Sequence, residues 1–554
     1  MSMEIQERNP GYNREFLFIP FDHNIERTKA VSEALDREGI WKSYPDYQED
    51  TRYLFRYVAE KFNPNTGDKC QCRHFTFEGW SRDRGLLRDE CYTVLWPKDP
   101  IKSYDFEICA IHLFLFETNV GIIAWELQMK TPADPDGFLS AYDIAEAEYL
   151  LKKIEKKSKK NVLLPKSCLC PEENTVYPEH PGRWATTMLD LTGRAVTETC
   201  LAGHIGEFFY FCARERKKAD DYGQVENRPL YAVANMMSYT EVDGRDRPYI
   251  DDPSGRSFSE SAVTDSEGRM NLPLRMPMRQ YFAREIFYLR NEYHKTFTYM
   301  LDRETDDKEN YEAAPDTLWG ISSEGVACIH DLTYREDLGD KKERFYERFR
   351  GNVRTKYMLL YVIVLHQKYV LYRFLTKVGN GVGDDLPGLE HYQTDLNRYK
   401  AEFFFTVVSE IQSHQKLYQK WLASLELDEL YQDVHEPLAE LAAAKARQKE
   451  KEEQELEAQR EHRENAMNNS IGVLAILGIF SALIDSVDFV TDVFGWNELG
   501  PALIFAKLAC IAVIAVVAVP AVTQFMQLKR EDKKLSTERE PDTDPGQKIH
   551  EHEM

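Results

Sequence analysis

The chain has 554 residues, and its 70 Lys and Arg against 93 Asp and Glu give a formal net charge of −23. This length implies roughly three folded units at about 100–200 residues each, and an aromatic content of 12% excludes a largely disordered chain. The excess of acidic residues excludes a protein that coats nucleic acids, because such a protein needs clustered Lys and Arg. No direct nucleic-acid partner is therefore expected.

The N-terminal segment and the cysteines both indicate a cytosolic chain. Residues 1–18 lack a basic segment followed by an apolar one, so no secretory signal is predicted. The 10 cysteines are scattered along the chain, which is typical of reduced thiols. Two Cys-x-Cys pairs could together supply four thiolates to zinc, and these candidate ligands are Cys70, Cys72, Cys168 and Cys170. The usual spacing of zinc ligands is wider, so ordinary buried or strand cysteines are the alternative.

Residues 1–350 mix short apolar runs with loops and helices, which predicts a cytosolic α/β domain that senses a regulatory ligand. Residues 107–129 are expected to form two strands around a turn at residues 117–119. A helix is expected over residues 133–160, and the charged segment 302–312 is expected to be a loop.

Four arginines of this region lie beside aromatic residues in the sequence and are candidates for ligand binding: Arg183, Arg275, Arg279 and Arg284. An arginine near an aromatic ring can bind a nucleotide, because it pairs with phosphate while the ring stacks on the base. The alternative is that all four are ordinary surface or interface residues. The sequence contains no GxxxxGK[ST] phosphate loop, no GxGxxG after a strand, no HExxH and no GxSxG, so no enzyme is predicted.

Residues 351–469 predict a helical stalk region that leads into a membrane. A buried helix is expected over residues 355–378, because their uncharged run of 11 residues is too short for a bilayer, and another long helix over residues 395–427. Residues 436–469 are dominated by good helix formers, so one helix is expected from about Pro437 to Phe494, about 87 Å long. So long a helix fits a loose bundle of identical copies, and a single solvated charged helix is the alternative.

Residues 470–528 predict a transmembrane hairpin with helices over residues 470–494 and 502–528. The uncharged run Leu508–Leu528 has 21 residues, or about 31 Å of helix, which matches a hydrocarbon core of about 30 Å. Basic residues flank the hairpin on both sides and its link has none, so the positive-inside rule places both termini in the cytoplasm. Residues 529–554 are expected to be a basic and then disordered cytosolic tail. A soluble buried hairpin is the alternative.

Acidic residues interrupt the end of the first predicted span. They lie on one helical face with a serine, at spacings of 4, 3 and 4: Ser481, Asp485, Asp488 and Asp492. A carboxylate facing lipid is costly, so this stripe is expected to face protein or water. In a ring of subunits each Asp would become a ring of carboxylates, and such rings attract cations. The alternatives are a position at the outer interface, or a structural pair with Lys507 of the second span.

The order of these parts resembles the CorA-type divalent cation channels. The resemblance is carried by RENAMNNSIGVLAILGIF, FGWNELGPALIFAKLACIAVIAVVAVP and QLKREDKK within residues 463–534, and FETNVGIIAWEL is similar to a strand pair of their cytosolic domain. It implies an α+β membrane protein that forms a funnel-shaped homo-oligomer, a homopentamer, in the lipid bilayer of the inner membrane. It also implies a divalent cation such as Mg²⁺ as the ion and a pore lined by the first membrane helix.

The sequence departs from this family at the pore. The family's Gly-Met-Asn motif at the pore mouth is represented by Gly495, Trp496 and Asn497, so the Met is replaced, and the first span carries three Asp residues. These departures look like the divergent CorA-like membrane effectors associated with type III CRISPR systems. That resemblance implies opening by a nucleotide second messenger in antiviral defence. A CorA-type magnesium transporter and a membrane-anchored cytosolic enzyme or scaffold are the alternatives.

Overall fold

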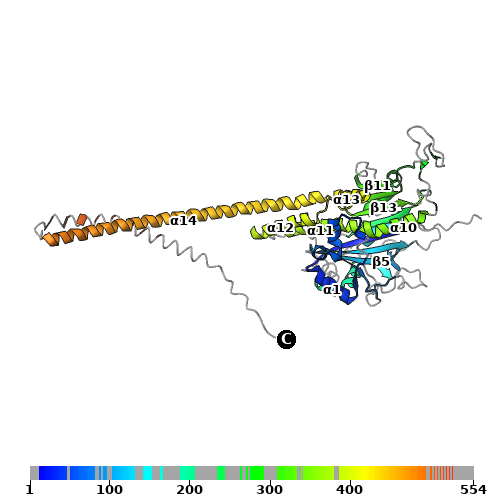
Figure 1. The fold of residues 1–554 in the computed structure, drawn as a ribbon, viewed down its shortest axis with the longest axis horizontal. Coiled ribbons are helices and arrows are strands. Elements are labelled where there is room, and N and C mark those ends of the chain that lie inside the picture. The colour runs from blue at the N-terminus through cyan, green and yellow to red at the C-terminus, as the bar shows by residue number, and fades with distance from the viewer. Residues whose placement is uncertain are drawn as a thin grey trace, which may run out of the picture. The chain divides into compact units, whose positions relative to one another are not determined.

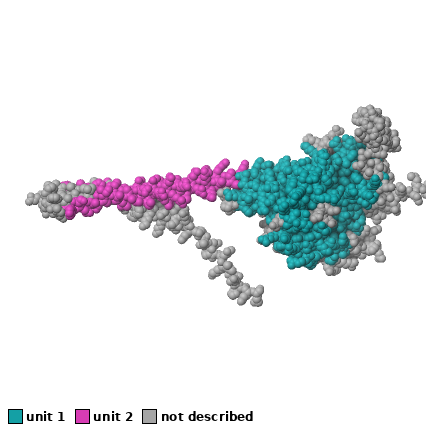
Figure 2. All heavy atoms as spheres, viewed as in Figure 1, with its two compact units in different colours: residues 1–439 teal, residues 440–554 magenta. Residues whose placement is uncertain are grey.

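The structure is a computed structural model. It describes most of residues 12–95, and then 103–130, 141–152, 188–205, 234–242, 275–291, 308–333, 341–379 and 386–494, with isolated residues between these ranges and from 500 to 527. Two compact units divide the chain: unit 1 is residues 1–439 and unit 2 is residues 440–554 (Figure 2). The helices between residues 351 and 439, expected as part of a stalk, belong to unit 1. The predicted boundaries of the stalk, hairpin and tail stay predictions.

The described strands of unit 1 form an eleven-stranded sheet and a separate pair, β9–β10. The main order is β11-β12-β13-β8-β1-β6-β5-β3-β2, with β4 and β7 added beside β5, and the pairs are antiparallel except β13 with β8. The strands are β1 Asn13–Asp22, β2 Trp41–Ser43, β3 Cys72–Phe77, β4 Cys91–Leu95, β5 Ser103–Phe116, β6 Val120–Lys130, β7 Leu163–Pro165, β8 Asn235–Val242, β9 Val263–Thr264, β10 Met270–Asn271, β11 Asn310–Ala314, β12 Thr317–Ile321 and β13 Gly325–Asp331.

Helices cover both faces of this sheet, as the alternation along β1 shows. Phe16 and Phe18 face a core shared with α11, α12 and α13, whereas Leu17 and Ile19 face a core shared with α1 and α5. The helices are α1 Thr28–Glu38, α3 Arg56–Phe62, η1 Pro64–Lys69, α4 Ala141–Lys152, α5 Met188–Val196, η4 Cys200–Gly203, α7 Met278–Tyr281, α8 Ala283–Asn291, α10 Lys342–Asn352, the π-helical turn η9 Val353–Tyr357, α11 Met358–Gly379, α12 Leu386–Phe403, α13 Gln412–Ser424 and α14 Leu427–Phe494 (Figure 1).

Several expectations from the sequence are confirmed. The strand pair predicted over residues 107–129 is β5 and β6, whose turn holds Asn119 in a left-handed conformation at φ 63°. The helix predicted over residues 133–160 is α4 in its described part. The predicted buried helix is α11, which is long and apolar enough for a membrane but lies mostly inside the core of unit 1.

Two expectations are wrong in part. The helix predicted over residues 395–427 is broken between α12 and α13, because Val408 and Ser409 bond instead to the backbone of residues 53–55. The amide of Phe55 donates to the Val408 carbonyl at 2.9 Å, and the Ser409 hydroxyl donates to the Tyr53 carbonyl at 2.7 Å. The loop predicted over residues 302–312 becomes strand β11 from residue 310 onward, and residues 302–307 lie outside the described part.

Helix α14 has 68 residues and begins ten residues before the predicted start at Pro437, which it includes. Its first turns are held in the core of unit 1 by a buried stripe, Leu427, Tyr431, Val434 and Leu438. Spacings of 4, 3 and 4 place these side chains on one face, and their burial stabilises the helix across the proline. The expected end at Phe494 is confirmed.

Candidate functional site

The membrane-type segment of α14 exposes a run of large apolar side chains. Residues Leu427–Ser486 include a window apolar enough to cross a membrane, of which only 6% is buried. The side chains are exposed by between 37% and 69% and comprise Ile471, Leu474, Ile476, Ile479, Phe480 and Phe489. A continuous apolar surface of this kind marks a site of protein or membrane interaction. With α11, the described chain has two helices long and apolar enough to span a membrane, but α11 is a core helix.

The acidic stripe lies at the end of this apolar segment. Ser481 and Asp485 are exposed on α14, and Asp488 is half-buried. Asp492 belongs to the same helix, although its side chain lies outside the described part, as do all three residues predicted for the pore mouth, Gly495, Trp496 and Asn497. Isolated positions of the second predicted span are helical, among them Ile504, Phe505, Leu508, Val516 and Val519, and these side chains are exposed.

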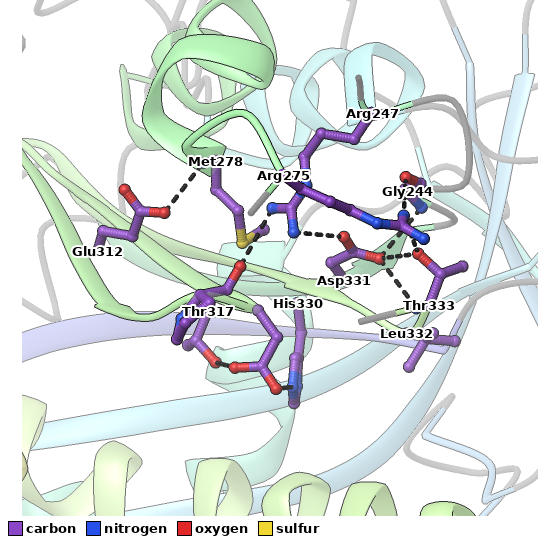
Figure 3. Close-up of polar contacts among 12 residues, drawn as sticks. Gly244, Arg247, Arg275, Met278, Glu312, Thr317, His330, Asp331, Leu332 and Thr333 are labelled. Carbon is purple, nitrogen blue, oxygen red and sulfur yellow. Dashed lines mark hydrogen bonds and ion pairs between the residues drawn. The ribbon is translucent and has the colours of Figure 1, made fainter. Parts of the chain in front are cut away.

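The four arginines predicted from the sequence are not gathered into a described ligand site. Arg275 donates to the Gly244 carbonyl at 2.8 Å and to the Thr333 hydroxyl at 3.2 Å, beside the buried ion pair between Arg247 and Asp331 at 3.3 Å (Figure 3). It therefore joins the residues after β8 to the end of β13. Arg279 and Arg284 are exposed on α7 and α8, and Arg183 lies outside the described residues.

The two described cysteines of the predicted zinc site are buried. The Cys70 thiol donates to the carbonyl of Cys72 at 3.3 Å, and burial raises the pKa of both thiols. Without a metal both side chains are therefore protonated thiols, and zinc would have to displace their protons to bind. Cys168 and Cys170 lie outside the described residues, and the described ones contain no group of three or more His, Cys, Asp or Glu that could hold a metal. The four-cysteine site stays a prediction.

A cleft of about 680 Å³ in unit 1 was not predicted from the sequence. It lies among the N-terminus of α1, the segment from η1 to β3, the β5–β6 turn, α11 and α12. Among the described residues, five basic and three acidic side chains line it, a formal charge of 5 − 3 = +2 in a chain of −23. The basic residues are Arg27, Lys29, Arg73, Arg373 and Arg398. These residues are spread over more than 370 positions of the sequence and form no motif. Of the segments that line the cleft, only the turn at residues 117–119 was predicted from the sequence.

Hydrogen bonds of α11 fix the cleft's inner wall. Arg373 donates to the carbonyl of Thr118, and its Nε lies 4.0 Å from Asp22. The Thr118 hydroxyl is 2.7 Å from Nε2 of His366, whose pKa is lowered to about 3 by burial. The ring is therefore neutral at physiological pH, and the β5–β6 turn is attached to α11 at two points.

Comparisons with known proteins found no match: no protein-family model fits the chain, no curated protein is significantly similar to it, and no solved structure is significantly similar.

Proposed function

We propose that this chain is the subunit of a homo-oligomeric, CorA-like cation channel of the inner membrane, opened from its cytosolic unit 1. One observation carries this proposal: α14 exposes an apolar segment that also bears Asp485 and Asp488. Carboxylates at membrane depth are expensive unless they face protein or water. A single hairpin cannot enclose a water path, whereas copies around an axis can, and their Asp rings would select cations.

The phase of α14 supports gating from unit 1. The buried stripe starts at Leu427 and the acidic stripe at Ser481, and both have spacings of 4, 3 and 4. Their separation of 481 − 427 = 54 residues equals about 15 turns at about 3.6 residues per turn. At this ideal repeat the two stripes fall on one helical face, and we propose that a rotation of the first turns within the core also turns the carboxylates.

Gating needs a ligand with different affinities for the closed and open states. The resemblance to the type III CRISPR effectors makes a nucleotide second messenger the proposed ligand, and opening would depolarise the cell to limit phage. A magnesium transporter is the second candidate, because Gly495 and Asn497 match two of the three residues of the family's pore motif. Genomic neighbours that encode CRISPR polymerase subunits would favour the effector.

The test is cation flux into liposomes that contain the purified full-length protein, measured with and without ADP as a probe. Asp485→Asn with Asp488→Asn should abolish flux while oligomer size stays unchanged. The matched control is Glu450→Gln with Glu453→Gln, which removes two exposed carboxylates at the same spacing on the same helix and should keep flux. Flux that survives the Asp variant, or a wild-type protein without flux in both conditions, would reject the pore.

A further inference from the structure

We propose that the cleft of unit 1 binds a small phosphorylated molecule that carries a planar ring. Its volume of about 680 Å³ lies within the range of about 300–1,000 Å³ that small-molecule sites occupy. The site lies within unit 1, and none of the three described arginines among those predicted from the sequence, Arg275, Arg279 and Arg284, lines it.

The acidic residues of the cleft already have partners. Glu402 accepts hydrogen bonds from Gln71 at 2.8 Å and from Arg398 at 3.1 Å. Glu117 accepts one from the hydroxyl of Thr28, and Asp395 lies 3.4 Å from the His391 ring. Of the three, only Glu402 is bonded to a cation of the cleft, so the lining keeps its formal charge of +2.

Three cations of the cleft are left without a carboxylate. Arg27, Lys29 and Arg73 make no ion pair within the described part of the chain. Arg27 and Lys29 stand at the N-terminus of α1, whose first turn has no acidic residue and no side-chain cap. Helix N-termini present free amide groups to anions, so Arg27, Lys29 and the N-terminus of α1 form the phosphate-binding corner of the proposed site.

Two side chains that line the cleft each have a buried polar atom without a hydrogen-bond partner among the described residues. Nε of Arg73 has no acceptor and Oε1 of Gln71 has no donor. An unsatisfied buried polar atom is costly and usually marks a missing partner. The protein itself covers both atoms, so a ligand in the cleft would reach them only if the two side chains moved, and the phosphate contact proposed here is with the charge of the Arg73 guanidinium.

Aromatic side chains form the wall supplied by α11 and α12. Phe374 is half-buried, its ring centroid is 6.2 Å from that of Tyr399, and the Tyr399 ring is stacked with Phe403 at 6.3 Å. Tyr399 and Phe403 are buried, so the planar ring of a ligand would pack against Phe374, which these two rings support from behind. Phosphate groups at the α1 corner and a ring at this wall together describe a molecule of the nucleotide class.

The position of α12 suggests how binding would regulate the channel, and this part rests on the proposed function. A ligand held between the α1 corner and Arg398 would draw α12 toward the β5–β6 turn. α12 leads through α13 into α14, whose first turns carry the buried stripe. Ligand binding would thus act on the helix that bears the carboxylates.

The test is calorimetric binding of ADP, pyrophosphate and adenosine to the full-length protein in detergent without divalent cations. ADP should bind more tightly than pyrophosphate and adenosine. Arg27→Gln with Lys29→Gln should weaken ADP binding by about tenfold or more, because charge-assisted contacts to phosphate are lost. Arg37→Gln with Lys42→Gln, two exposed cations away from the cleft, is the matched control and should bind ADP normally.

This experiment tests the binding site independently of the channel, because it measures ligand binding and not cation flux. The proposed site would be rejected if neither ADP nor pyrophosphate binds, or if the cleft variant and the control variant lose the same amount of ADP affinity. Arg73→Lys keeps the charge but removes the forked donors, so it should weaken ADP more than adenosine. If ADP binds as described but the wild-type protein conducts no cations, the binding site is supported and the channel is rejected.

Discussion

Replacing Glu126 with glutamine should destabilise unit 1 strongly. Glu126 lies on β6 at 1% exposure, with Nε of Arg354 at 2.5 Å, Nε of Arg14 at 3.3 Å and the His112 ring at 3.7 Å. Arg354 belongs to the π-helical turn η9 that leads into α11, so this carboxylate attaches the sheet to the helix layer. The glutamine side chain would keep the shape of the glutamate but leave two guanidinium groups without their counter-charge.

The magnitude follows from the pKa of Glu126. Burial alone would raise it, but the hydrogen bond to His112 and the charges of Arg354 and Arg14 outweigh burial and hold it at about 2. The difference from the usual 4.5 corresponds to about 3 kcal/mol. Because the folded-state pKa is depressed, this stability is present above about pH 4.5 and is lost as the pH falls toward 2. Breaking a buried pair costs about 3–5 kcal/mol, in agreement.

The assay is chemical denaturation of the full-length protein in detergent, followed by intrinsic fluorescence between about pH 3 and pH 7. Glu126→Gln should lose about 3 kcal/mol at pH 7, and its difference from wild type should shrink as the pH falls. Glu60→Gln removes a half-buried carboxylate paired with the exposed Arg56 and Lys69 and should have a much smaller effect. A variant as stable as wild type at pH 7 would show that the ion cluster does not hold the two layers together.

Three further predictions concern α14, a buried acid and a close backbone contact. Inserting two alanines after Glu450 turns the acidic stripe by about 200° and should abolish flux, whereas seven alanines, close to two turns, should restore it. Burial raises the pKa of Glu15 to about 7, so stability should fall as the pH rises from about 4.5 through 7, and Glu15→Gln should remove this fall in thermal melts. Gly121→Ala would place a Cβ 2.2 Å from the buried Phe21 ring and should cost about 1–3 kcal/mol by denaturation.

The elements that were predicted correctly are those that a short stretch of sequence determines. The β5–β6 hairpin follows from apolar runs on either side of a polar turn, and α11 from an apolar run too short for a bilayer. The end of α14 at Phe494 follows from the glycine after it. The start of α14 at Leu427 could not be predicted in this way. A helix tolerates Pro437 here because the burial of its preceding turns in the core stabilises it, and that burial depends on the tertiary fold.

Long-range contacts decided what the sequence could not indicate. The break between α12 and α13 depends on hydrogen bonds from Val408 and Ser409 to a segment more than 350 residues earlier. Arg275 appeared as a candidate because aromatic residues lie near it in the sequence, but the fold directs it to a backbone carbonyl and a threonine. The basic cleft was missed for the same reason, since its cations come from separate elements that only the fold brings together.

We expect this chain to work with partners, because it carries two opposite charge imbalances. Asp485 and Asp488 follow an apolar exposed helix, where each carboxylate costs about 2.5–3.5 kcal/mol if it enters a bilayer alone. Arg27, Lys29 and Arg73 leave the cleft cationic although the chain as a whole is strongly acidic. We expect an external partner for each imbalance: copies of the chain and water for the carboxylates, and an anion for the cleft. Since α14 begins in the core of the unit that holds the cleft and carries the carboxylates, filling the cleft and rotating the carboxylates are expected to be linked equilibria.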